Sequence, residues 1–151
     1  MGSQGRQTLQ NFPEQGLRFM KYLLDTNIIV GYLRDKPGKR KLIKKLFTEG
    51  DLTVSLITYG ELEYGACRAK EYKTEKGKVE QCFADLEIEV LPLKKVTMEI
   101  FAKIKRNLEL KGSGLDDFDL LIGATALEND ITLATDNAKH FNRLSGLNVY
   151  K

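Results

Sequence analysis

Residues 20–30 read MKYLLDTNIIV, and this stretch decides the fold. Residues 21–24, KYLL, are a short and mostly apolar segment typical of a buried strand, and the apolar residues beyond Asp25 recur at helical spacing. Thr26 and Asn27 are residue types that favour the N-cap of a helix. The sequence therefore predicts a tight turn from strand to helix at Asp25.

The alternation of strand-like and helix-like segments continues along the chain. Further strands are predicted at residues 52–55, 87–91, 131–134 and, at the edge of the sheet, 147–150. A charged helical stretch ends at residue 85, and other helices are predicted at residues 36–49, 58–68, 94–110, 116–128 and 137–144. Strands separated by such helices need crossover connections, which favours an α/β fold with a mainly parallel sheet of four to five strands and helices on both faces.

Length and composition favour a single domain at residues 20–151. Of the 151 residues, 42% are apolar and 30% are charged, a mixture typical of globular proteins and unlike that of disordered or fibrous chains. Residues 1–19 are polar and lack the apolar segment of a secretory signal, so we expect a leader or flexible extension, native or artificial. No apolar run approaches the ~20 residues of a membrane span, so no membrane partner is predicted.

The cysteine and histidine content excludes several site chemistries. Cys67 and Cys82 lie far apart without a C-x-x-C spacing, which predicts reduced thiols and a cytoplasmic location. His140 is the one histidine of the chain, which argues against a histidine-rich zinc centre and against a mechanism that needs two imidazoles. We expect a surface or capping role for it.

Four carboxylates fall at positions where an open α/β sheet binds ligands. Asp25 and Asp136 each follow a predicted strand, and Glu61 and Asp119 lie near the N-terminal ends of predicted helices. Each position also has a structural explanation, because aspartate caps helices and the helix dipole favours acids by about 0.3–1 kcal/mol. That explanation does not account for the apolar neighbours of Asp25 and Asp119, which disfavour full exposure to solvent.

The chemistry of such a group of acids points to a metal. Carboxylates that converge in a partly dry cleft repel one another unless a divalent cation holds them ionised. Oxygen ligands favour Mg²⁺ or Mn²⁺ over zinc. The sequence therefore predicts a magnesium or manganese site.

Four motifs of the chain resemble those of the PIN-domain nucleases, and most closely those of the VapC-type toxins of toxin–antitoxin pairs. The match runs close to the whole length from Met20, through MKYLLDTNIIV, ITYGELEYGA, LDDFDLLIGATALEND and LATDNAKHF. A single DTN or TDN would carry little information, whereas four motifs in this order are specific. The resemblance implies a PIN-like three-layer sandwich.

The resemblance also implies an activity and its residues. By position, Asp25, Glu61, Asp119 and Asp136 would form the acidic quartet that binds one or two Mg²⁺ (or Mn²⁺) ions and hydrolyses RNA phosphodiester bonds. A homodimer is implied, as is a cognate antitoxin whose tail occupies an apolar and basic groove. Asp116, one turn before Asp119, is either an outer ligand or a helix cap.

Polar and basic residues accompany the four acids. Thr26, Asn27 and Thr135 flank them and either bind ligands or serve as ordinary caps and turns. The net charge is only +3, but setting the quartet aside leaves 24 positive against 17 negative residues, a balance of +7 that suits a nuclease. Basic residues cluster at Lys36, Lys39, Arg40, Lys41, Lys44 and Lys45, and at Arg68, Lys70 and Lys73.

Three other functions stay open at this point. The same domain would also suit RNA processing without an antitoxin. A receiver-type signalling domain has an α/β fold with Mg²⁺-binding acids as well, but it needs an acidic pair after the first strand, and Asp25 has no acidic neighbour. A PIN fold that only binds partners is disfavoured by the four intact acids.

Overall fold

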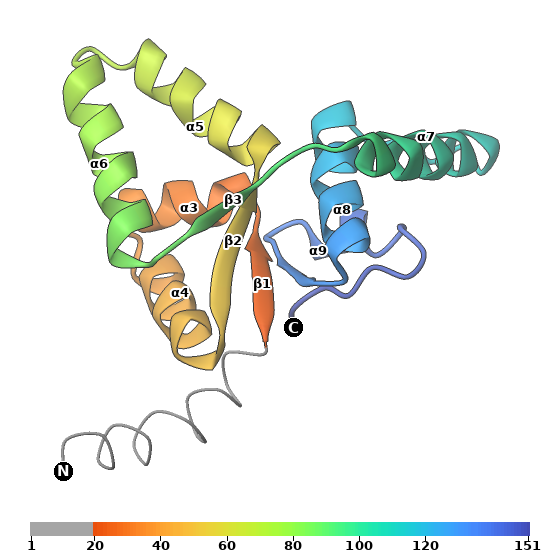
Figure 1. The fold of residues 1–151 in the computed structure, drawn as a ribbon, viewed down its shortest axis with the longest axis horizontal. Coiled ribbons are helices and arrows are strands. Elements are labelled where there is room, and N and C mark those ends of the chain that lie inside the picture. Colours follow the sequence, from red (N-terminus) through yellow and green to blue (C-terminus); the bar gives the residue numbers. More distant parts are fainter. Residues whose placement is uncertain (1–19) are drawn as a thin grey trace, which may run out of the picture.

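The fold alternates strands and helices along the chain (Figure 1). The structure is a computed structural model and describes residues 20–151. The predicted leader, residues 1–19, lies outside the described residues. Four strands and seven helices are found in the described part, which confirms the α/β class.

The four strands form one sheet in the order β3-β2-β1-β4, and all pairings are parallel. The strands are β1 (Lys21–Leu24), β2 (Asp51–Ser55), β3 (Glu89–Leu91) and β4 (Thr132–Ala134). Because β1 lies between β2 and β4, Leu23 has Thr53 as a neighbour on one side and Leu133 on the other. The carboxyl ends of all four strands therefore meet at one edge of the sheet.

The predicted edge strand at residues 147–150 is reduced to a single bridge, between Leu133 and Val149. Backbone hydrogen bonds from Leu133 N to Asn148 O (2.9 Å) and from Tyr150 N to Leu133 O (2.8 Å) flank this bridge. The segment therefore pairs with β4 at one position and forms no longer strand.

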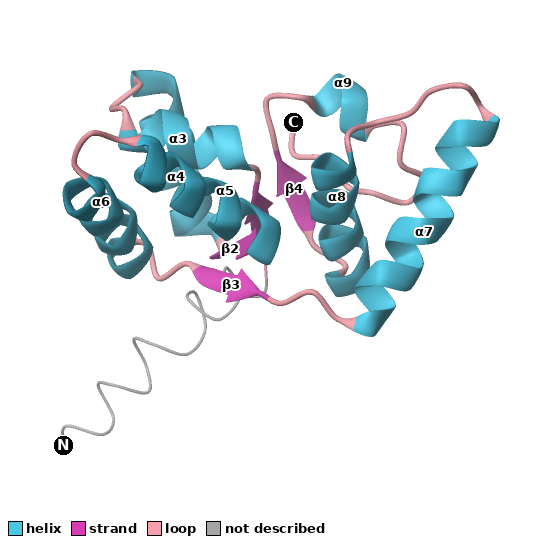
Figure 2. Ribbon diagram, turned by 90° about the horizontal axis from the view of Figure 1, so that it is seen from above, coloured by secondary structure: helices cyan, strands magenta, loops and turns pink. Residues whose placement is uncertain are grey.

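Seven helices cover the sheet, namely α3 (Thr26–Leu33), α4 (Pro37–Glu49), α5 (Leu56–Arg68), α6 (Tyr72–Asp85), α7 (Lys95–Leu110), α8 (Asp117–Asn129) and α9 (Ala138–Phe141). Figure 2 shows α3 to α6 on one side of the sheet and α7 to α9 on the other. Side chains of β1 alternate accordingly: Tyr22 and Leu24 belong to the core with α3, α4 and α6, whereas Leu23 belongs to the core with α7, α8 and α9. The predicted three layers are confirmed.

Local sequence signals set the helix ends. Pro37 stands at the first position of α4 and Gly50 ends that helix, as predicted. The helix predicted from residue 58 begins earlier, at Leu56, because the side chain of Ser55 accepts a hydrogen bond from Ile57 N (2.9 Å) and caps it.

Two further expectations concern membranes and thiols. No helix within residues 20–151 combines the length and the apolar character that a membrane crossing requires. Cys67 is exposed, Cys82 is buried, and both thiols are free, as the sequence predicts.

Candidate active site

The turn between β1 and α3 places Asp25 at the carboxyl end of an interior strand, where it is only 5% exposed. Its Oδ1 accepts a hydrogen bond from Thr26 N (2.8 Å), and its Oδ2 accepts one from Oγ1 of Thr135 (2.7 Å). Asp25 is therefore itself the N-cap of α3, whereas the sequence favoured Thr26 and Asn27 for this role. The reason is that Asp25 is the last residue with the extended backbone that an N-cap needs.

The environment of Asp25 disfavours its negative charge. Burial raises the pKa of this carboxyl, the hydrogen bonds from Thr135 and Thr26 lower it, and the charge of Asp136 raises it. The net direction is upward. A buried carboxylate held only by neutral donors lacks positive charge, and a bound cation would supply it.

Glu61 lies in the second turn of α5 and is held by the first residue of α3. Oγ1 of Thr26 donates a hydrogen bond to Oε1 of Glu61 (2.5 Å) and lies 3.0 Å from Oγ1 of Thr58. Because the single hydroxyl proton of Thr26 goes to Glu61, the hydroxyl of Thr58 donates to Thr26. Thr58 is fully buried, so this chain of hydroxyl groups anchors Glu61 to the core.

Asp119 lies in the first turn of α8 and interacts with several other charges. Burial is the largest cause of its raised pKa; the charges of Asp25, Asp116 and Glu61 raise the pKa further, and that of His140 lowers it. Segments far apart in the sequence therefore bring Asp25, Glu61 and Asp119 close enough for their charges to repel.

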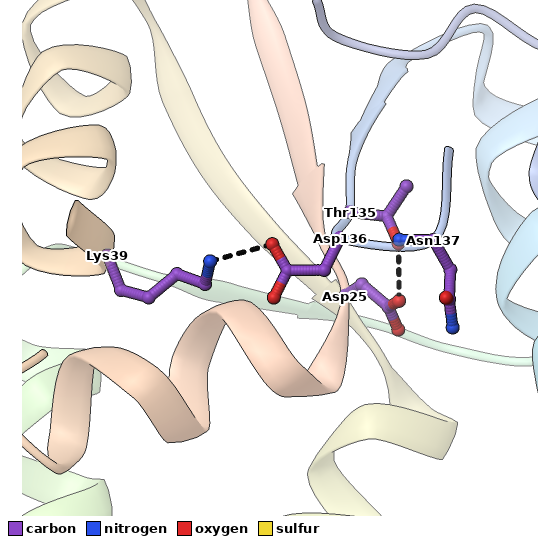
Figure 3. Close-up of polar contacts among 5 residues, drawn as sticks. All are labelled: Asp25, Lys39, Thr135, Asp136 and Asn137. Atoms are coloured by element: carbon purple, nitrogen blue, oxygen red, sulfur yellow. Dashed lines mark hydrogen bonds and ion pairs between the residues drawn. The ribbon is translucent and has the colours of Figure 1, made fainter. Parts of the chain in front are cut away.

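Asp136 follows β4 and is paired with a lysine of α4 (Figure 3). Nζ of Lys39 lies 2.7 Å from Oδ1 of Asp136, and the two side chains are 26% and 46% exposed. The neighbouring Thr135 contacts Asp25, and its Oγ1 also accepts a hydrogen bond from Asn137 N (2.9 Å). The turn after β4 thus holds one acid through a hydroxyl group and presents another to an ammonium group.

Asp116 is the N-cap of α8. Its Oδ2 accepts a hydrogen bond from Phe118 N (3.1 Å), and the residue is exposed. The structure confirms the helix-cap role of Asp116, and the role of an outer metal ligand stays a prediction. Its charge nevertheless contributes to the raised pKa of Asp119.

The chemistry of these acids fits a hard divalent cation, because every predicted ligand is a carboxylate and the pKa values of Asp25 and Asp119 are raised. Within residues 20–151, however, no three acidic, histidine or cysteine side chains lie close enough together to ligate one ion. Instead, each of three acids has its own partner: Thr135 holds Asp25, Thr26 holds Glu61, and Lys39 holds Asp136.

A cavity of about 690 Å³ opens between α3, α5 and α6, and Glu61 is part of its wall. Its lining combines apolar side chains with three cationic ones, Arg34, Arg68 and Lys78, and two acidic ones, Glu61 and Glu75. The acidic site therefore adjoins a surface of apolar and mixed charged side chains.

Sequence reasoning missed two residues of this site. Lys39 was assigned to a basic cluster, and its ion pair with Asp136 joins residues 97 positions apart, so no local signal indicates it. Thr58 gave no signal either, because its contact with Thr26 depends on how α5 packs against α3. In the same basic cluster, Arg40 pairs with Asp35 at 3.0 Å.

Comparisons with known proteins identify the family of this chain. Residues 22–147 match the family model described as PIN domain. The chain is 30% identical over 129 residues to ribonuclease VapC2 of Rickettsia felis, covering 85% of this chain and 95% of the relative. It is 33% identical over 132 residues to ribonuclease VapC1 of Methanocaldococcus jannaschii, covering 86% of this chain and 87% of the relative.

The fold is similar to that in the crystal structure of VapBC2 from Rickettsia felis bound to a promoter DNA fragment. The TM-score is 0.79 at 26% identity, over 87% of this chain and 98% of that chain. The PIN-like architecture is confirmed, and the family match leaves no support for a receiver-type domain. The chain therefore belongs to the PIN-domain family and, within it, to the group whose members are named VapC ribonucleases.

Proposed function

We propose that this protein is a metal-dependent endoribonuclease that cleaves RNA in the cytoplasm as the toxin of a toxin–antitoxin pair. The observation that carries the proposal is Asp25, a carboxylate only 5% exposed at the end of an interior strand, whose charge acts on Asp119. The ribonuclease relatives support the activity, and the similarity to a VapBC complex supports the pairing with an antitoxin.

Each of the four acids has a role in this proposal. Asp25, Glu61, Asp119 and Asp136 would hold one or two Mg²⁺ or Mn²⁺ ions through their carboxylate oxygens. Such ions supply a water of lowered pKa and stabilise charge on the phosphate. Thr26 fixes the direction of the Glu61 carboxylate.

The test is cleavage of RNA by the purified protein with Mg²⁺ or Mn²⁺, with sequencing of the RNA ends. Asp25→Asn and Asp119→Asn each remove one ligand charge, so either variant should reduce cleavage to the level seen without enzyme. A chelator should have the same effect on the wild-type protein.

Asp117 offers a matched control for Asp119. It lies two residues away in the first turn of α8 and pairs with Lys105 at 2.9 Å. Asp117→Asn should therefore cleave RNA at the wild-type rate. Cleavage that survives the chelator, or that persists in Asp119→Asn, would contradict the proposal.

The cavity beside Glu61 supports an antitoxin partner, because its apolar side chains and its three cationic and two acidic ones suit a peptide tail. Gly65 lines this cavity, and a Cβ at that position would meet no atom within 4 Å. Gly65→Trp should fill the cavity and reduce co-purification of the protein encoded by a small neighbouring gene. If no such gene adjoins this one, an RNA-processing role without an antitoxin becomes the better interpretation.

We also propose that the protein is a homodimer. Large apolar side chains are exposed on α7 and at the start of α8, where Leu110 is 68% exposed and Phe118 is 50% exposed. Exposed apolar surface of this kind is typical of contacts between proteins. Light scattering should give twice the 17.1 kDa of one chain, and a monomer mass would contradict the dimer.

A further inference from the structure

We propose that Lys39 is a positioning residue whose ammonium group competes with divalent metal for Asp136, and that this competition sets the metal affinity of the acidic site. The inference rests on the proposed function, because it takes Asp136 as a metal ligand. It adds a residue that is neither a metal ligand nor a base. Whereas the four acids strengthen metal binding, this residue weakens it.

The ion pair directs Asp136 away from Asp25. Nζ of Lys39 lies 2.7 Å from Oδ1 of Asp136. In Figure 3 the carboxylate of Asp136 points toward Lys39, whereas the carboxylate of Asp25 points toward Thr135. The ammonium group occupies one lone pair of Oδ1 and draws charge from the carboxylate, which makes Asp136 a weaker metal ligand. The ion pair and a metal therefore compete for the same carboxylate.

Gly31 gives the lysine its path to Asp136. Gly31 is buried in α3, and the stem of Lys39 passes over it. A Cβ at residue 31 would lie 3.1 Å from Cβ and 3.3 Å from Cδ of Lys39, and it would lie even closer to Cγ. Because Gly31 has no side chain, it leaves a notch on α3 for the aliphatic stem of Lys39. The stem in this notch holds the ammonium group beside Asp136.

The charges around the site make this competition matter. Asp136 is the one of the four acids that forms a salt bridge within residues 20–151. Lys39 therefore supplies positive charge to a cluster in which Asp25, Glu61 and Asp119 are close enough to interact. A divalent cation bound at Asp136 would also lie near the displaced ammonium group of Lys39, and these two positive charges would repel each other. Both effects weaken metal binding as long as Lys39 is present.

The experiment is a titration with Mn²⁺ at pH 7 and low salt, in which free Mn²⁺ is measured by electron paramagnetic resonance. Lys39→Gln should bind Mn²⁺ about two- to fivefold more tightly than the wild type, the effect of a partly exposed ion pair. Lys44→Gln is the matched control, because Lys44 is exposed on the same helix and its loss changes the net charge equally. It should bind like the wild type.

A second variant keeps the charge and changes its position. Gly31→Ala leaves the lysine in the chain but displaces its stem from the notch. This variant should also bind Mn²⁺ more tightly, by a smaller factor. A merely structural role of the ion pair would instead lower the Tm of the metal-free variants and leave the Mn²⁺ affinity unchanged.

The outcomes separate this inference from the proposed function. Lys39→Gln that binds Mn²⁺ no more tightly than the wild type, or Lys44→Gln that gains as much, would overturn the role of Lys39. If the wild type binds Mn²⁺ and Asp119→Asn does not, the metal site stands whatever Lys39 does. If the wild type binds no Mn²⁺, both proposals fail.

Discussion

Oγ1 of Thr26 donates a hydrogen bond of 2.5 Å to Oε1 of Glu61, although the two residues are 35 positions apart and belong to different helices. The bond joins the start of α3 to the second turn of α5. Behind it, the buried hydroxyl group of Thr58 donates to Thr26. The position of one predicted metal ligand therefore depends on a threonine that is not itself an acid.

Thr26→Val tests this dependence, because valine keeps the shape of threonine and removes the hydroxyl group. Glu61 loses its donor and Thr58 loses its acceptor. We expect the free energy of unfolding to fall by about 1–3 kcal/mol and RNA cleavage to fall with it, as measured by urea denaturation and a cleavage assay. Thr26→Ser should restore both, and Thr74→Val, at an exposed position of α6, should change neither.

The raised pKa of Asp119 predicts how stability depends on pH without metal. The folded protein binds a proton at Asp119 more tightly than the unfolded chain does. Stability should therefore fall as the pH rises from the ordinary carboxyl pKa of about 4 through the raised value, and the loss should persist at neutral pH. Asp119→Asn removes this loss, so its Tm in chelator should exceed that of the wild type at pH 7.5 and approach it near pH 4.

Asp117→Asn is again the control, and its expected change in Tm has the opposite sign. Asp117 pairs with Lys105, so its loss removes an attraction instead of a repulsion. Its Tm at pH 7.5 should equal or fall slightly below that of the wild type. A Tm of Asp119→Asn below that of Asp117→Asn at pH 7.5 would favour the interpretation of Asp119 as a purely structural acid.

Gly123 allows α8 to pack against the end of the chain. A Cβ at this position would collide with Cδ2 of Leu144, which is buried. Gly123→Ala should therefore destabilise the protein despite the better helix propensity of alanine, since overpacking costs typically 1–3 kcal/mol. Gly77→Ala measures the propensity alone, because a Cβ there meets no atom within 4 Å, and it should stabilise by up to ~1 kcal/mol.

A double-mutant cycle separates the collision from other effects of Gly123→Ala. Leu144→Val shortens the side chain that the new Cβ would meet. In that background, Gly123→Ala should cost less than it does in the wild type, as urea denaturation can measure. Equal costs in the two backgrounds would show that Leu144 is not the cause.

The two cysteines should differ strongly in reactivity. Burial raises the pKa of Cys82 to about 11, and the charge of Asp85 adds to this effect. Cys67 is exposed. Because the thiolate is the reactive form, a thiol reagent should modify Cys67 quickly in the folded protein and Cys82 only after unfolding. Cys67→Ser should abolish the fast reaction, and a fast reaction that remains would contradict the burial of Cys82.

The sequence predicts most of the architecture because its signals are local. The apolar run at residues 21–24 and the glycine at the end of α4 each act within a few residues, so strand β1 and the helix end at Gly50 form where expected. Residues 147–150 have the right composition for a strand, but pairing depends on how this segment lies against β4, and one bridge forms. A local sequence pattern does not contain that long-range information.

The candidate site divides in the same way. The four acids are predicted as ligands because Asp25 and Asp136 follow strands and Glu61 and Asp119 lie near the N-terminal ends of helices. Their partners are not, since the contacts of Asp25 with Thr135 and of Asp136 with Lys39 join residues about a hundred positions apart. The sequence left both Asp25 and its neighbours Thr26 and Asn27 as N-cap candidates, because the deciding factor is the backbone conformation of one residue.

The order of the strands has a consequence for how the protein is made. Asp25 accepts a hydrogen bond from Thr135, which lies 110 residues later and follows the last strand to be synthesised. A chain still attached to the ribosome at β3 contains Asp25 and Glu61 but neither Asp119 nor Asp136. The full set of predicted metal ligands therefore exists only after almost the whole chain has been synthesised.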